Sequence, residues 1–114
     1  MNTIAHPPSY YAFSANDAGP RASLRGEEQA DVCVIGAGYT GLSAAIHLRQ
    51  AGYNVTVLEA NKVAWGASGR NGGQIIGGLG HDPERFVKVI GEDGVRTIYR
   101  MGIEARDIIR ERVA

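Results

Sequence analysis

The chain lacks an excess of charge of either sign. Its 12 lysine and arginine residues balance 12 aspartate and glutamate residues. A domain that binds nucleic acid needs a basic face to neutralise phosphates. The balanced composition shows no such electrostatic footprint, and we therefore predict no nucleic-acid partner.

Cysteine is almost absent. The single cysteine, Cys33, excludes a disulfide within the chain. It stands among Val32, Val34 and Ile35, so we expect it to be a small buried apolar residue. A reactive thiol needs an electropositive and partly exposed environment, which these neighbours do not favour. His47 has no cysteine or acid at metal-ligand spacing, and we predict no metal site.

We also expect no secretory leader, because residues 1–20 contain no basic segment followed by an apolar one. The stretch 32–48 contains no Asp, Glu, Lys or Arg over 17 residues, which approaches the length that spans a membrane. Three glycines and several polar residues interrupt it, so a strand, a turn and a helix explain it better. We expect a cytoplasmic protein without a membrane span.

Glycine, by contrast, is abundant, and three glycines have the spacing GxGxxG after an apolar strand predicted over 31–36. Gly36 lets the chain turn sharply out of the strand. Gly38, without a Cβ, lets the backbone approach a pyrophosphate, and Gly41 lets the following helix pack close to the sheet. The helix, predicted over 39–51, begins with free amides and a partial positive charge that favour phosphate.

A second apolar strand is predicted over 54–58, and it ends on Glu59. This acid follows Gly41 by 18 residues, close to the offset of about 20 that is typical of dinucleotide-binding βαβ units. Its carboxylate can accept hydrogen bonds from ribose hydroxyls, and it would repel the 2′-phosphate of NADP. Because these parts occur together and in order, they predict dinucleotide binding rather than an ordinary glycine-rich turn.

A long glycine-rich loop over 60–80 follows Glu59. Loops of this length are uncommon inside compact domains and are usually functional. The run 66–74, GASGRNGGQ, interleaves glycines with Arg70, Asn71 and Gln74. This mixture favours a loop that passes close to a flat ligand over a flexible linker.

The remaining segments precede and follow this unit in the sequence. Residues 1–30 contain several prolines and are expected to form an extended arm, whose rings Tyr10, Tyr11 and Phe13 either dock on the rest of the protein or belong to a loosely ordered terminus. After the loop, Asp82 as N-cap and Pro83 at the first helical position predict a short helix that ends at Gly91. A longer helix is predicted over 93–113.

At this point the sequence resembles a known family. The segments DVCVIGAGYTGLSAAIHL, VTVLEA and WGASGRNGGQ are similar to the N-terminus of FAD-dependent amine and amino-acid oxidoreductases of the D-amino-acid oxidase superfamily, and within it to gamma-glutamylputrescine oxidase-like proteins. The resemblance is strong over residues 9–80, including part of the arm, and rests on helical character alone over 81–114. GASGRNGGQ is more specific than the glycine fingerprint.

The resemblance implies FAD as the cofactor. The glycine turn would surround its pyrophosphate, Glu59 would hold the adenosine ribose, and Ala67 and Ser68 would contact the phosphate and ribitol. Arg70 either places a positive charge near the flavin or is a phosphate-facing or structural arginine. The implied cofactor-binding residues are Gly36, Ala37, Gly38, Tyr39, Thr40, Gly41, Glu59, Ala60, Ala67, Ser68, Arg70, Asn71, Gly72, Gly73 and Gln74.

The resemblance also implies a reaction, the oxidation of the C–N bond of a small amine or amino acid. A hydride passes to the flavin, and the imine product hydrolyses. The cofactor carries the redox chemistry, while the protein orients the substrate. We single out no catalytic acid or base in this chain.

The fold class expected from these parts is α/β, with a Rossmann-like βαβ unit from an incomplete doubly wound parallel sheet and a C-terminal helical segment. Residues 1–30 would form the arm and 31–114 the N-terminal part of an FAD-binding domain, without the substrate domain. Two strands and one helix cannot bury both faces of a sheet.

The chain therefore looks like a truncated gene product or an incomplete record, with weak FAD retention, poor solubility and no turnover on its own. Trp65 also departs from the lighter residue that we expect there. A non-catalytic nucleotide-binding module and, less favoured, an NAD-dependent dehydrogenase are the alternative functions.

Overall fold

The chain forms two compact units, residues 1–72 and 73–114. The computed structural model describes residues 8–16, 19, 21–77 and 82–113. The first unit contains α1 (Tyr10–Ser14), β1 (Val32–Ile35), α2 (Tyr39–Gln50), β2 (Val55–Leu58) and the short 3-10 helix η1 (Ala67–Gly69); the second contains α3 (Pro83–Val113). Among the helices described, none pairs sufficient length with sufficient apolarity to cross a lipid bilayer.

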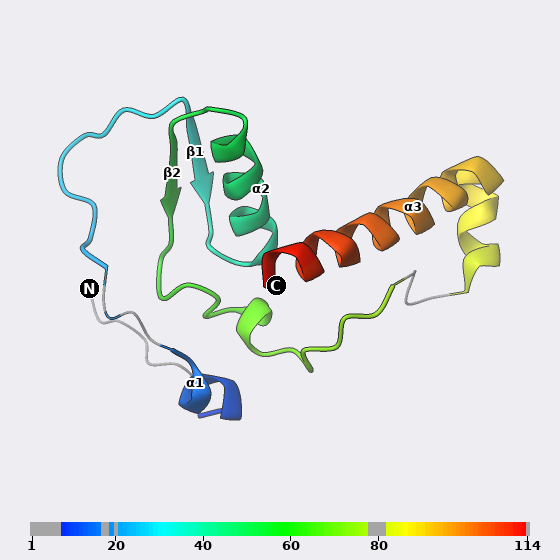
Figure 1. Ribbon diagram of the computed structural model, residues 1–114, viewed down its shortest axis with the longest axis horizontal. Helices are drawn as coiled ribbons and strands as arrows, with labels where there is room; N and C mark the ends of the chain where they lie inside the picture. The colour runs from blue at the N-terminus through cyan, green and yellow to red at the C-terminus, as the bar shows by residue number, and fades with distance from the viewer. Residues whose placement is uncertain (1–7, 17–18, 20, 78–81, 114) are drawn as a thin grey trace. The chain divides into compact units, whose positions relative to one another are not determined.

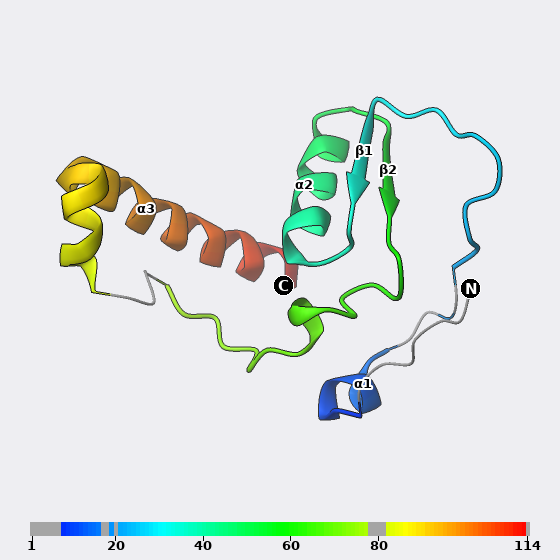
Figure 2. The ribbon, with the colours of Figure 1, turned by 180° about the vertical axis from the view of Figure 1, so that it is seen from behind.

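The centre of the first unit is a parallel strand pair with a crossover helix. β1 and β2 pair in register from Val32 opposite Val55 to Ile35 opposite Leu58. α2 connects them and lies against one face of the pair, as both ribbon views show (Figure 1, Figure 2). The two strands and the helix predicted from the sequence are confirmed to within two residues at their ends.

The helix packs closely on β1 because the helix and the turn before it carry small residues at the contact. A Cβ built on Gly41 would collide with the carbonyl oxygen of Gly36 and would lie 3.3 Å from Cγ1 of Val34. Ala45 on α2 and Ala37 in the turn are buried, and Ala37 is only 2% exposed. The predicted role of Gly41 in helix–sheet packing is therefore confirmed.

The end of α2 and the start of β2 are fixed by backbone hydrogen bonds. The Tyr53 amide donates to the Leu48 carbonyl at 3.1 Å and the Gly52 amide to the Arg49 carbonyl at 3.0 Å, the pattern of a Schellman motif. The Asn54 amide then donates to a carboxylate oxygen of Asp31 at 2.7 Å. This contact aligns the beginnings of the two strands.

The expectation that Cys33 is buried is wrong, because its side chain is exposed. Alternate side chains of a strand point to opposite faces, and Val34 lies on the face toward α2. Cys33 and Ile35 therefore point away from α2, and Ile35 is 87% exposed. None of the described residues covers this side of β1, in line with the expectation that two strands and one helix cannot bury both faces of a sheet.

The arm is not extended throughout, which corrects the prediction for residues 1–30. Residues Tyr10–Ser14 form the helix α1, capped by Ser9, whose hydroxyl accepts a hydrogen bond from the Ala12 amide at 3.2 Å. The rings of Tyr10 and Tyr11 contact each other edge to face with centroids 6.1 Å apart, and Phe13 is 89% exposed. Within the described part of the arm, the rings do not dock into a core.

The second unit is a long helix with one interruption. α3 begins at Pro83, and the Glu84 amide donates to a carboxylate oxygen of Asp82 at 3.0 Å, which confirms the predicted cap. Gly91 has non-helical angles, φ 69° and ψ 173°, so two helical segments meet there. The predicted end of the short helix at Gly91 is also confirmed. Val95, at 8% exposed, is the buried residue of the longer segment.

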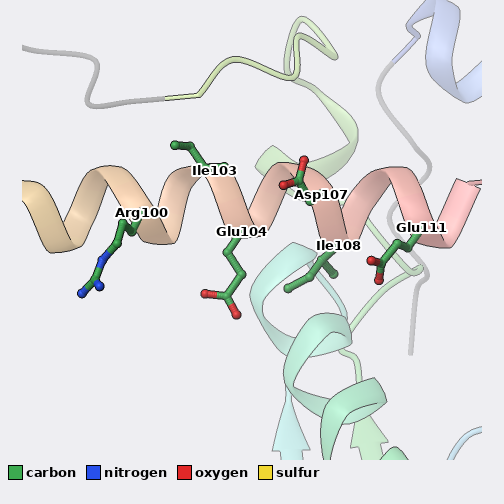
Figure 3. A pocket seen from close by; sticks show the side chains of 6 residues that line it. All are labelled: Arg100, Ile103, Glu104, Asp107, Ile108 and Glu111. Atoms are coloured by element: carbon green, nitrogen blue, oxygen red, sulfur yellow. The ribbon is translucent and has the colours of Figure 1, made fainter.

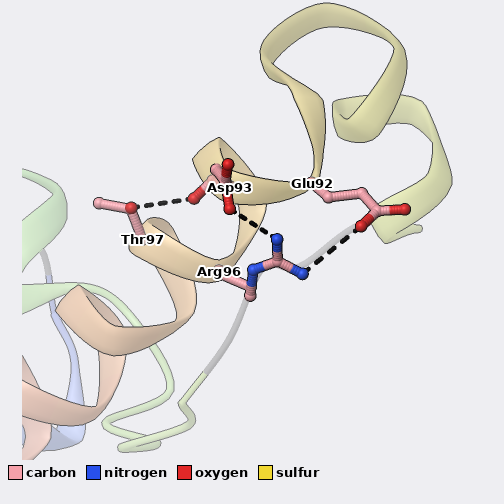
Figure 4. Close-up of polar contacts among 4 residues, drawn as sticks. All are labelled: Glu92, Asp93, Arg96 and Thr97. Atoms are coloured by element: carbon pink, nitrogen blue, oxygen red, sulfur yellow. Dashed lines mark hydrogen bonds and ion pairs between the residues drawn. The ribbon is translucent and has the colours of Figure 1, made fainter.

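Polar contacts mark the start of the longer segment (Figure 4). The Arg96 guanidinium lies 2.6 Å from Asp93 and 3.4 Å from Glu92, and the Thr97 hydroxyl donates to the Asp93 carbonyl at 2.9 Å. Acidic residues in the first turn of a helix complement its dipole. The ion pairs themselves are exposed, and such pairs contribute little to stability.

Candidate functional site

The turn from β1 into α2 meets the residue that follows β2. Because the strands are parallel, both end at the same edge of the pair (Figure 1). The Gly36 amide donates to the Leu58 carbonyl at 2.7 Å, and the Ala37 amide donates to Oε2 of Glu59 at 2.7 Å. The glycine turn and the acid that the sequence predicted as one site are thus in direct contact.

Glu59 is held as an anion by main-chain amides. Its Oε2 accepts the Ala37 hydrogen bond and its Oε1 accepts one from the Asn61 amide at 3.0 Å. The hydrogen bond from Ala37 is the main cause that lowers the pKa of Glu59 below its ordinary value; the Asn61 amide acts in the same direction, and burial opposes both. Each carboxylate oxygen can accept more than one hydrogen bond, so Glu59 retains capacity for a ligand hydroxyl.

The glycine-rich loop reaches the same place from further along the chain. Ser68 in η1 accepts a hydrogen bond on its hydroxyl from the Tyr39 amide, the first of α2, at 3.0 Å. A Cβ built on Gly38 would lie only 2.8 Å from this hydroxyl oxygen. The loop and the first turn of α2 therefore form one surface at the opening of the helix.

Asn71 ties the loop to itself and to α2. Its side-chain amide nitrogen lies 2.8 Å from the Ser68 carbonyl oxygen, 3.2 Å from that of Ala67 and 3.3 Å from the Tyr39 hydroxyl. Tyr39 thus contacts the loop through both its backbone and its side chain. This explains why a polar residue is interleaved with the glycines at this position.

Ala64 is a residue of this region that the sequence analysis missed. It has a φ of 58°, in the left-handed region that residues with a Cβ rarely adopt. The Ala64 amide donates to the Ala37 carbonyl at 2.9 Å. A Cβ built on Gly69 would collide with the carbonyl oxygen of Ala64. Nothing about an alanine in the sequence signals this conformation, which is held by the contact with the glycine turn.

Trp65 and Arg70 form a pair within the loop. The guanidinium carbon of Arg70 lies 5.0 Å from the centroid of the Trp65 ring, within the range of a cation–π interaction. Nε of Arg70 also donates to the Gly66 carbonyl at 3.2 Å. The ring is half-buried, whereas the arginine is exposed.

The structure gathers most of the predicted site residues, but not all of them. Thr40 and Gly41 share the first turn of α2 with Tyr39, whereas Ala60 and Gly72 are exposed in the loop. Gly73 and Gln74 begin the second unit and are exposed. Gly73 and Gln74 therefore do not belong to the compact unit that contains the opening of α2.

The second unit contains an open hollow of about 460 Å³ along one helix. Six residues of α3 line it, and three of them are acidic (Figure 3): Arg100, Ile103, Glu104, Asp107, Ile108 and Glu111. No residue that the sequence analysis assigned to a ligand site lies there. In the described parts of the chain, histidine, cysteine and acidic side chains form no group of three that could hold a metal ion.

Comparisons with known proteins bear on this surface. The family model described as FAD dependent oxidoreductase matches residues 31–114. The chain is 48% identical to gamma-glutamylputrescine oxidoreductase of Escherichia coli K12 and 46% identical to the probable oxidoreductase OrdL of Haemophilus influenzae, in each case over 95% of this chain and 25% of the relative. A second probable oxidoreductase OrdL, from Rhizobium meliloti, is 40% identical over 73% of this chain and 19% of its own length. No solved structure matches the chain.

The chain spans a quarter of the length of the first two relatives. The matched region begins at the strand that leads into the glycine turn and includes every residue of the surface at the opening of α2. Since the family model covers well over half of the sequence, the chain belongs to the family of FAD-dependent oxidoreductases.

Proposed function

We propose that this chain supplies the FAD-binding N-terminal portion of an oxidoreductase that oxidises the C–N bond of a small amine or amino acid. The observation that carries the proposal is the convergence of three segments at the opening of α2. These are the glycine turn, Glu59 after β2, and the Ser68 loop, joined by the Ala37–Glu59 and Tyr39–Ser68 hydrogen bonds.

FAD is the cofactor of the family, and the residues at this surface fit it. Gly38 has no Cβ, which would meet the Ser68 hydroxyl oxygen at 2.8 Å, so the loop can approach the backbone before the first turn of α2 closely. The amides of Thr40 and Gly41 belong to the first-turn amides for which an α-helix supplies no carbonyl partner. Such amides, together with the helix dipole, favour a phosphate group.

The roles that follow are specific. The Thr40 and Gly41 amides would bind the pyrophosphate, and the remaining lone pairs of Glu59 would accept the adenosine ribose hydroxyls. Ser68, already at the first amide of α2, would contact the phosphate or the ribitol. The other residues inferred from the family resemblance stay predictions, including Gly73 and Gln74 in the second unit.

When bound, FAD supplies the acceptor for a hydride from the carbon that carries the nitrogen. This chain's residues bind and orient the cofactor, and none of them is assigned as an acid or a base. The name of the Escherichia coli relative refers to gamma-glutamylputrescine, which supports a small amine as the substrate class. The substrate site would belong to residues outside the segment shared with these relatives.

The same reasoning extends to the fold. The parallel pair with its crossover helix supports a Rossmann-like unit that further strands would extend into a doubly wound sheet. The boundary expected at residue 30 and the cytoplasmic location stay predictions.

The test uses the complete polypeptide that carries this segment, with Gly38→Ala compared to Gly77→Ala. A Cβ on Gly77 meets nothing within 4 Å. A Cβ on Gly38 would displace the Ser68 hydroxyl and keep the pyrophosphate from the backbone. Loss of one hydrogen bond to the charged pyrophosphate costs about 1.5–3 kcal/mol, which corresponds to at least about a tenfold loss of FAD affinity.

The measurement is flavin absorbance after desalting, followed by titration with FAD. Wild-type loading of a double variant with valine at both Gly36 and Gly38 would contradict the proposed cofactor site. Amines and amino acids are then added under anaerobic conditions. Bleaching of the bound flavin supports the oxidoreductase, whereas a bound flavin that no such compound reduces favours a non-catalytic module.

A further inference from the structure

We propose that Tyr39 and Asn71 are positioning residues, which fix the Ser68 hydroxyl so that its proton donates to the pyrophosphate of the bound cofactor. This inference rests on the proposed function. Of the phosphate and the ribitol, Ser68 then contacts the phosphate, and the side chains of Tyr39 and Asn71 hold it there.

The Ser68 hydroxyl lies at the opening of α2. Its oxygen is 3.0 Å from the Tyr39 amide nitrogen, and it would lie 2.8 Å from a Cβ built on Gly38. The oxygen is therefore in front of the backbone that joins the glycine turn to α2. The amides of Thr40 and Gly41, which a helix leaves without carbonyl partners, follow in the same turn. A phosphate bound by these two amides would lie next to Ser68.

The proton of this hydroxyl is available to such a phosphate. A serine hydroxyl donates one proton and accepts through two lone pairs. The Tyr39 amide donates to one lone pair of Ser68, so the hydroxyl proton points away from that amide. No group among the described residues accepts this proton. Hydrogen bonds to a charged acceptor such as phosphate are stronger than those between neutral groups.

Three side chains and amides hold the hydroxyl in place as a closed ring of contacts. The side-chain nitrogen of Asn71 lies 2.8 Å from the Ser68 carbonyl oxygen and 3.3 Å from the Tyr39 hydroxyl oxygen. The bond from the Tyr39 amide to the Ser68 hydroxyl completes the ring. Tyr39 belongs to α2, whereas Ser68 and Asn71 belong to the loop. The ring therefore fixes the loop on the helix, and without the Tyr39 hydroxyl Asn71 would hold Ser68 only within the loop.

The experiment measures the dissociation constants of FAD and of ADP for the complete polypeptide after removal of its flavin. ADP contains the pyrophosphate and the adenosine ribose but neither ribitol nor flavin ring. The variants are Ser68→Ala, Tyr39→Phe, Asn71→Ala and the double variant of Ser68→Ala with Tyr39→Phe. Tyr53→Phe is the matched control, because it removes the same hydroxyl from an exposed tyrosine in the turn after α2.

The two ligands should lose affinity by the same factor in each variant. We expect a loss of about tenfold or more for Ser68→Ala, which removes a hydrogen bond to a charged group. Tyr39→Phe should cost about two- to tenfold, the range of a neutral hydrogen bond, and Asn71→Ala at least as much. The phosphorus-31 resonances of bound FAD should shift in all three. Tyr53→Phe should match wild type.

The double variant tests whether Tyr39 acts through Ser68. Once the serine hydroxyl is gone, Tyr39→Phe should have no further effect on either dissociation constant. Additive losses would overturn the inference, because Tyr39 would then act apart from Ser68. A loss for FAD with unchanged ADP binding would also overturn it, since the Ser68 contact would then lie on the ribitol or the ring.

A purely structural role for Ser68 has its own signature. The N-cap Gly38 has no side chain to cap α2, and Ser68 could serve only as that cap. The variants would then lower thermal stability while both affinities and the phosphorus-31 resonances stay at wild-type values, which overturns the inference. If Ser68→Ala does not fold, Tyr39→Phe decides: equal losses for FAD and ADP with shifted phosphorus-31 resonances support the inference, and any other result overturns it.

Failure of the proposed function is distinguishable from all these outcomes, since wild-type protein would then bind neither FAD nor ADP.

Discussion

Glu59 shows how a single residue serves both the fold and the site. Its carboxylate bonds the amides of Ala37 and Asn61, so it holds the glycine turn against the end of β2 before any ligand arrives. The sequence predicted an acid for ribose hydroxyls. It did not predict that this acid also organises the turn, because a hydrogen bond over 22 residues of sequence depends on the register of the strands.

The pKa of Glu59 gives the first prediction at this scale. Hydrogen bonds to the carboxylate, that of Ala37 foremost, hold its pKa below the ordinary value. The group therefore contributes stability that is fully present above the ordinary glutamate pKa and is lost as the pH falls through the lowered value of the folded state. We expect Glu59→Gln to flatten the acid limb of the stability profile of the complete polypeptide, measured by urea denaturation from neutral to acidic pH.

The control is Glu27→Gln, at an exposed position of the arm, which should keep the wild-type profile. An acid limb of equal steepness in wild type and Glu59→Gln would mean that these amide hydrogen bonds do not stabilise the fold.

At the scale of elements, the sequence predicted the helix starts, breaks and close contacts that depend on neighbouring residues in the chain. The cap at Asp82, the break at Gly91 and the close approach at Gly41 follow from residue types and spacing. The exposure of Cys33 and the left-handed Ala64 do not, because they depend on which surfaces are covered and on a contact with the glycine turn. Likewise, α1 is too short for apolar periodicity to reveal, although Ser9 is a typical N-cap.

The break in α3 provides the second prediction. Gly91 has a φ of 69° and a ψ of 173°, a region that essentially only glycine adopts, and a residue with a Cβ costs about 1–3 kcal/mol there. We expect Gly91→Ala to lower the free energy of unfolding of the complete polypeptide by this amount, monitored by the helical circular dichroism signal in urea.

Gly91→Asn is the comparison, since asparagine is favoured in the left-handed helical region but not at a ψ of 173°. It should lose about as much stability as Gly91→Ala. Equal or greater stability of the alanine variant would show that the two helical segments can join into one straight helix without cost.

On the scale of the whole molecule, the described residues bury few side chains. Large apolar residues in both units are exposed, among them Ile35, Ile76, Val89 and Val113. Two strands and one crossover helix also leave one face of the sheet without a packed layer, whereas a stable α/β domain has helices on both faces. Exposed apolar surface of this extent marks a site for further protein contacts or a cause of aggregation.

We therefore expect the isolated chain of residues 1–114 to aggregate, to retain little FAD and to turn over no amine. Size-exclusion chromatography with detection of flavin absorbance tests this, followed by an assay with a dye as electron acceptor. A monomeric yellow chain that oxidises an amine would show that the two units are sufficient, and the complete polypeptide is the positive control.

The side of β1 that points away from α2 offers an experimental handle. It carries the only sulfhydryl of the chain, at Cys33, so a maleimide or a disulfide reagent should modify a single position in the folded protein. Additional polypeptide laid across this side would protect the sulfur from labelling. The labelling rate of Cys33 thus reports whether this side of β1 is covered, and a lower rate in a longer chain would show that additional residues pack there.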